Sequence, residues 1–80
     1  MRVTVTIHRR PEIADPEGTT VARALHELGY EEVAEVRFDR IIQLELKGTD
    51  PDTAKERVEE MCRRLLANPV LEDFTVEVEG

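Results

Sequence analysis

The sequence predicts a single α+β domain over residues 1–80. We expect a two-layer sandwich, related to the ferredoxin-like fold, with two helices on one face of a small, mostly antiparallel sheet. Residues 2–8 and 74–78 alternate apolar and polar side chains, which is typical of half-buried strands. Two segments that each begin with Asp-Pro carry apolar residues at helical spacing between these strands. The sheet should have three long strands, or four if residues 33–47 form a hairpin.

The first expected strand is residues 2–8, and it ends at the polar and proline residues 9–11. Its β-branched residues favour a strand, and the apolar ones share one face: Val3, Val5 and Ile7.

The first helix is expected over residues 16–28. Asp15 is a good N-cap, and Pro16 suits the first helical position. Gly18 fits a helix interior poorly, so Thr19 or Thr20 is a rival cap. Gly29 supplies the C-terminal stop. The apolar stripe of this helix is Val21, Ala24, Leu25 and Leu28.

Residues 33–47 allow two interpretations. Their apolar side chains share one parity apart from an interruption at Arg40. A hairpin at Asp39-Arg40 would either split the apolar set between two faces or strain Ile41. We favour one long strand that bends or bulges near Asp39-Arg40.

The second helix should begin with Asp50 as the cap and Pro51 as the first helical residue. Asn68 can take the left-handed C-terminal position, and Pro69 prevents the helix from continuing. The expected buried stripe is Ala54, Val58, Met61, Cys62 and Leu65.

Charge and size exclude several classes of function. Eighteen acids and eleven bases give a net charge of −7, which argues against a nucleic-acid partner. No apolar run reaches membrane-spanning length, so we expect a cytoplasmic protein. A chain of 80 residues with one cysteine cannot gain stability from disulfides. Self-association as a dimer or tetramer is the remaining common way to bury more surface.

The sequence offers no convincing catalytic, cofactor-binding or metal-binding residues. Cys62 lies on an apolar stripe and is better explained as a small core residue. His26 is expected on an exposed helix flank without an orienting partner. The acids at 15, 17, 50 and 52 sit at helix starts, where capping explains them. The four glycines form no phosphate-binding loop.

The only compact basic cluster is His8, Arg9 and Arg10. Such a cluster can bind the acidic patch of a partner, or it can simply protect the edge of a sheet. With Arg37, these are the residues that we expect to contact a partner. The residues expected to act structurally are Asp15, Pro16, Gly18, Gly29, Asp50, Pro51, Cys62, Asn68 and Pro69.

The sequence resembles the PurS family, the small subunit of phosphoribosylformylglycinamidine synthase, over nearly its whole length. The resemblance rests on DPEG at 15–18, ALHELGY at 24–30, EVRF at 35–38 and, above all, MCRRLLANPVLEDFTVEV at 61–78. One departure is visible: Phe38 and Asp39 stand where the family often has a glycine after the VR pair.

The resemblance implies a non-catalytic subunit of an ATP-dependent C–N ligase in purine biosynthesis. It would bridge a glutaminase subunit, which acts as a glutamine amidotransferase, and a synthetase subunit, and assist ammonia transfer between them. ATP and Mg²⁺ would bind the synthetase, and no active site or cofactor is expected on this chain. Excluding water at such a junction would protect the ammonia from side reactions.

Two other functions stay open on the residues alone. The first is a small-molecule-sensing regulatory domain of the ACT or ferredoxin-like type, because one fold hosts many functions. The second is a small acylphosphatase-like hydrolase. It is disfavoured because no glycine-rich cradle follows Arg9 and Arg10.

Overall fold

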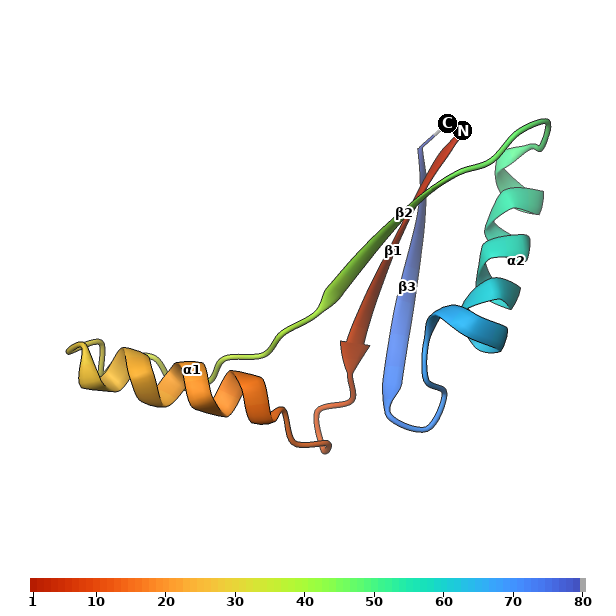
Figure 1. The fold of residues 1–80 in the computed structure, drawn as a ribbon. Helices are drawn as coiled ribbons and strands as arrows, with labels where there is room; N and C mark the ends of the chain where they lie inside the picture. The colour runs from red at the N-terminus through yellow and green to blue at the C-terminus, as the bar shows by residue number, and fades with distance from the viewer. Residues whose placement is uncertain (80) are drawn as a thin grey trace.

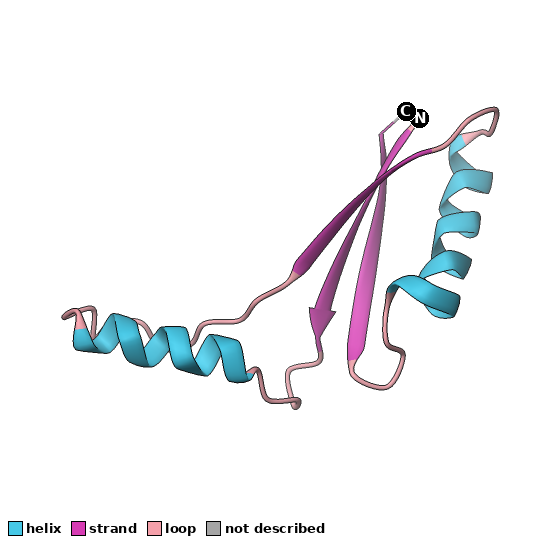
Figure 2. Ribbon diagram, in the orientation of Figure 1, coloured by secondary structure: helices cyan, strands magenta, loops and turns pink. Residues whose placement is uncertain are grey.

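The computed structural model describes residues 1–79 and has the α+β character that the sequence predicts (Figures 1 and 2). Strand β1 (Arg2–Arg9) is the centre of a three-stranded antiparallel sheet with the order β2-β1-β3. The remaining elements are α1 (Pro16–Glu27), β2 (Arg40–Glu45), α2 (Pro51–Met61), the π-helical turn η1 (Cys62–Leu66) and β3 (Glu72–Glu79).

The hydrophobic core lies between one face of the sheet and α2. The apolar residues of β1 are the most deeply buried, as their alternation predicts, and in register Val5 stands opposite Ile42 of β2 and Val76 of β3. From α2 and η1, the core receives Ala54, Val58 and Cys62. Both neighbouring strands place apolar residues beside Val3 and Val5, so this face of the sheet is apolar up to Arg40, which stands opposite Ile7.

Helix α1 does not cover the sheet, so the expectation of two helices on one face holds only for α2. Figure 1 shows α1 extending away from the end of the sheet where β1 finishes. The molecule is therefore elongated, with principal extents of 51 × 25 × 14 Å. The buried apolar core includes no residue of α1. Instead, α1 lies against the segment that returns to β2, residues 33–38.

Residues 33–47 form no hairpin, and within them only residues 40–45 are a strand, β2. Strand β2 pairs with β1, and the ladder stops at the pair of Ile7 with Arg40. Residues 33–39 have no strand partner in the described part of the chain. The prediction of one strand instead of a hairpin is therefore correct, but the strand is shorter than the expected residues 33–47. The polar contacts described below hold residues 33–38 to α1 and to the turn before it, and keep them out of the sheet.

The end of the second helix differs from its prediction. Leu65 was expected in the buried stripe, but it is 83% exposed. The cause is η1, whose wider turn accommodates one additional residue, so that Ala67 is buried instead. Asn68 does not adopt a left-handed conformation either, because no residue except glycine has a positive φ angle among residues 1–79.

Candidate functional site

The base of α1 is fixed by the carboxylate of Asp15, which is only 7% exposed. One carboxylate oxygen accepts a hydrogen bond from the Gly18 amide at 3.0 Å, which makes Asp15 the N-cap as predicted. The other accepts from the Phe38 amide at 2.8 Å. These two bonds, the one from Phe38 foremost, lower the pKa of Asp15. Asp15 thus ties the helix to the segment that returns from it.

Gly18 is required by a close approach of backbone rather than by its own backbone angles. A Cβ atom at this position would overlap the carbonyl oxygen of Val36. A second tie lies further along α1, where Nε2 of the exposed His26 is 2.7 Å from the carbonyl oxygen of Val33. The helix start DPEG therefore joins α1 to the antiparallel segment of residues 33–38. Thr19 and Thr20 are not the N-cap of α1, because Asp15 is.

Residues 10–39, which contain α1 and its two connections, are called the arm below. Arg37 braces the arm from within, because it donates to the carbonyl oxygens of Arg10 at 3.0 Å and Ile13 at 2.9 Å. Arg9, at the end of β1, donates to the carbonyl oxygen of Ala14 at 2.8 Å. Two guanidinium groups thus satisfy carbonyl oxygens of a turn that has no regular structure.

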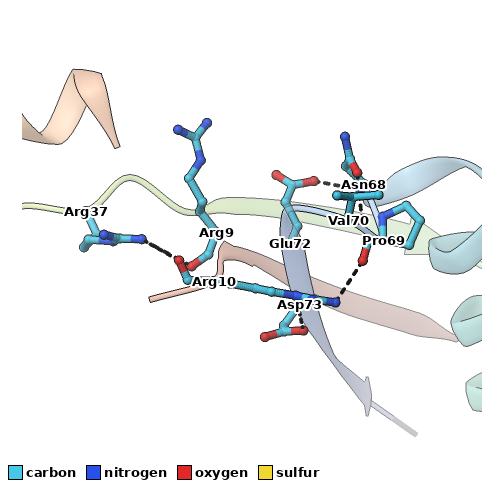
Figure 3. A network of polar contacts seen from close by, with 8 residues as sticks. All are labelled: Arg9, Arg10, Arg37, Asn68, Pro69, Val70, Glu72 and Asp73. Atoms are coloured by element: carbon cyan, nitrogen blue, oxygen red, sulfur yellow. Dashed lines mark hydrogen bonds and ion pairs between the residues drawn. The ribbon is translucent and has the colours of Figure 1, made fainter. Parts of the chain in front are cut away.

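The loop that precedes β3, residues 67–71, is held by Glu72. The Glu72 carboxylate accepts a hydrogen bond from the backbone amide of Asn68 at 2.8 Å, as Figure 3 shows. It also accepts two hydrogen bonds from the Arg40 guanidinium, at 2.8 and 2.9 Å. These bonds, the one from Asn68 foremost, lower the pKa of Glu72. The Asn68 side chain accepts from the Val70 amide at 2.9 Å, which closes the turn. These two bonds explain why an asparagine stands four residues before a glutamate in the segment NPVLED, residues 68–73.

Arg10 joins the arm to this loop (Figure 3). Its side chain donates to the carbonyl oxygen of Pro69 at 2.8 Å, and its amide donates to the carbonyl oxygen of Leu71 at 2.9 Å. Its Nε also lies 3.3 Å from a carboxylate oxygen of Asp73. Because Arg37 in turn holds the carbonyl oxygen of Arg10, the arm and the loop form one continuous polar junction.

The structure gathers the expected partner-contact residues at this junction. His8, Arg9 and Arg37 line a shallow cavity of about 250 Å³, and His8 Nδ1 lies 3.6 Å from Asp39. Arg10 points instead toward the loop before β3. The alternative role as protection for a sheet edge stays open, because β1 is the central strand but its ladder with β2 stops at Ile7, which leaves His8 and Arg9 paired with β3 alone. Contact with a partner stays a prediction for these residues.

The other residues with an expected structural role are placed as follows. Asp50 caps α2, and its hydrogen bonds from Thr53 lower its pKa; Pro51 begins the helix. Gly29 has a φ angle of +99° and ends α1. Cys62 is fully buried, and burial raises the pKa of its thiol. Sequence reasoning missed Arg40 and Glu72 as partners, and their opposite charges were the only available signal.

The polar junction holds backbone segments in place. Its arginines, Arg9, Arg10 and Arg37, contact carbonyl oxygens and, for Arg10, the carboxylate of Asp73. In residues 1–79, no three side chains of the His, Cys, Asp and Glu types are close enough together to hold a metal ion. None of the helices in that range is long and apolar enough to cross a membrane.

Comparison with known proteins identifies the family. Residues 2–80 match the model of the family PurS, described as phosphoribosylformylglycinamidine (FGAM) synthase. The PurS subunit of Methanocaldococcus jannaschii is 42% identical over 98% of this chain and 94% of its own length. The Bacillus subtilis subunit is 40% identical over 98% of this chain and 92% of its own length.

Solved structures agree with the sequence relatives. The crystal structure of M. jannaschii PurS superposes with a TM-score of 0.88 at 41% identity, and covers 98% of this chain and 94% of that one. A chain in the structure of PurLQS from Thermotoga maritima superposes with a TM-score of 0.85 at 32% identity, covering 95% and 93%. The chain belongs to the PurS family, the small subunit of FGAM synthase in purine biosynthesis.

Proposed function

We propose that this chain is a non-catalytic bridge that joins the glutaminase and synthetase subunits of FGAM synthase and assists ammonia transfer between them. The observation that carries this proposal is the similarity to a chain of the T. maritima PurLQS structure, a complex that includes PurS. The ionisable groups with shifted pKa values also fit a structural role, since caps, backbone bonds or burial explain each shift. The comparisons do not favour a small-molecule-sensing domain.

The cofactors and the cellular location follow from this role. We assign ATP and Mg²⁺ to the synthetase subunit and no cofactor to this chain. We assign the complex to the cytoplasm, as suits a subunit of a purine biosynthesis enzyme.

A second copy of this chain is the other partner that we propose, as a dimer or tetramer. The exposed fractions are 73% for Leu28, 52% for Tyr30 and 45% for Phe38, and all three lie on the arm. A neighbouring copy would cover these side chains and add the buried surface that a short chain needs. Sedimentation at micromolar concentration should show an oligomer, and a monomer alone would contradict this part of the proposal.

Reconstitution tests the bridge directly. The glutaminase and synthetase subunits from the same source are mixed with and without this chain, and ATP turnover is measured with either glutamine or ammonium as the nitrogen donor. Omitting the chain should abolish the glutamine-dependent turnover and spare the ammonium-dependent turnover, because only the former needs transfer between subunits. Equal glutamine-dependent activity without the chain would contradict the proposal.

A further inference from the structure

Leu65 is displayed on the surface by a specific backbone feature. An uninterrupted α-helix would carry the stripe of Ala54, Val58 and Met61 on to Leu65 and bury it. In η1, however, the Ala67 amide donates to the carbonyl oxygen of Cys62 at 3.0 Å, five residues back. The core closes with the following residues instead, and Leu65 remains 83% exposed. Such π-turns occur frequently at functional sites.

Leu65 forms one wall of a groove along the exposed side of α2. The groove has a volume of about 270 Å³ and is lined by Arg57, Glu60, Met61, Arg64 and Leu65. Arg64 pairs with Glu60 at 3.3 Å, so Arg57 is the uncompensated charge of the lining. Two arginines and one glutamate give the lining a net charge of +1, whereas the whole chain carries −7.

We propose that this groove docks an acidic, apolar segment of one of the two enzyme subunits, an inference that rests on the bridging function proposed above. The leucine and the methionine would receive the apolar side chain, and Arg57 with Arg64 would pair with the acids beside it. Exposed arginines with apolar neighbours are also typical of protein interfaces.

A second copy of this chain fits the groove less well. In a two-fold symmetric contact the same surface faces itself, so two groove linings that each carry a net charge of +1 would meet. Such like-charge contacts disfavour association. The groove is therefore assigned to a different polypeptide, and self-association is assigned to the arm.

The test measures the affinity of this chain for the separate glutaminase and synthetase subunits. The variant Leu65→Ser removes the apolar wall and should weaken binding to one of them by about tenfold or more, the effect expected when one leucine is no longer buried. Arg57→Glu combined with Arg64→Glu should weaken the same binding and reduce its dependence on salt. Leu65→Met keeps an apolar side chain at this wall and should retain most of the wild-type affinity.

The controls separate docking from folding and from self-association. Lys55→Glu makes the charge change of one Arg→Glu substitution on α2 outside the groove lining and should leave the affinity unchanged. The thermal midpoint and the sedimentation of Leu65→Ser should match wild type, since this side chain is mostly exposed. Wild-type affinity in Leu65→Ser, or a changed oligomeric state, would overturn the docking proposal alone. Failure of wild type to bind either subunit would overturn the bridge as well.

Discussion

Asp15 couples the stability of the arm to pH because its carboxylate accepts two backbone hydrogen bonds. Its pKa in the folded protein lies below the ordinary value of 3.8. A lowered folded pKa means that the carboxylate contributes its full stability above pH 3.8 and loses it as the pH falls through the folded value. Protonation would weaken the tie between α1 and Phe38.

The variant Asp15→Asn tests this coupling. It should be less stable than wild type at pH 7, and the difference should narrow below pH 3.8, because the amide has no proton to gain. Denaturant unfolding at several pH values between neutrality and pH 2 measures this. Asp50 and Glu72 titrate in both proteins and cancel in the comparison. A difference that stays constant with pH would contradict the assignment.

Gly18 shows how one missing side chain permits the joint at the base of the arm. Gly18→Ala should destabilise the protein by about 1–3 kcal/mol, because the new methyl group overlaps the carbonyl oxygen of Val36 and must displace its segment. Denaturant unfolding measures the loss. Thr20→Ala, an exposed position on the same helix, is the matched control and should change stability by about 0.5 kcal/mol or less.

Cys62 should behave as a core side chain rather than as a reactive thiol. Burial raises its pKa and blocks access, so the thiolate that reacts with alkylating reagents is scarce. Iodoacetamide should leave the native protein unlabelled and should label it fully in denaturant, with mass spectrometry as the readout. Rapid labelling of the native protein would show that α2 or η1 opens from the sheet.

At the scale of single elements, the features that the sequence predicts are those with local causes. The caps Asp15 and Asp50, each followed by proline, place both helix starts correctly because capping involves residues three positions apart. The alternation of Val3, Val5 and Ile7 likewise predicts which face of β1 is buried. All the residues that make up each of these patterns lie within one turn of helix or one strand.

Other elements depend on contacts between distant segments, and the sequence pattern does not reveal these. Leu65 continues a helical stripe in the sequence, but η1 shifts the register and exposes it. Phe38 shares the apolar parity of β2, yet its amide is captured by Asp15, 23 residues earlier. Apolar periodicity cannot detect a competing polar contact of this kind. The same reason hides the pairing of Arg40 with Glu72.

The loop before β3 offers a test at this scale. Glu72→Ala removes the acceptor for Arg40 and for the Asn68 amide and should cost about 1.5–3 kcal/mol, the usual loss for charged hydrogen bonds that are partly buried. Glu77→Ala on the same strand is exposed and should be nearly neutral. Equal unfolding free energies for the two variants would show that the loop keeps its shape without Glu72.

The whole molecule combines a packed end with an arm that lacks a core of its own. The radius of gyration is 16.2 Å, whereas a compact chain of this length has about 12 Å. Asp15 and Gly18 are the only buried residues of the arm, and polar contacts hold it in place. The arm therefore offers a shaped surface before any partner binds, which lowers the entropy lost on association.

The apolar side chains of the arm should mediate association between copies. Leu28→Asp places a charge at a residue that is 73% exposed, so the fold of one copy should survive while self-association weakens by about tenfold or more. Sedimentation equilibrium across a range of concentrations measures this shift. Val70→Asp makes the same change at a residue that is 71% exposed in the loop before β3, and it should associate like wild type. Loss of association in Val70→Asp but not in Leu28→Asp would move the contact between copies from the arm to the loop before β3.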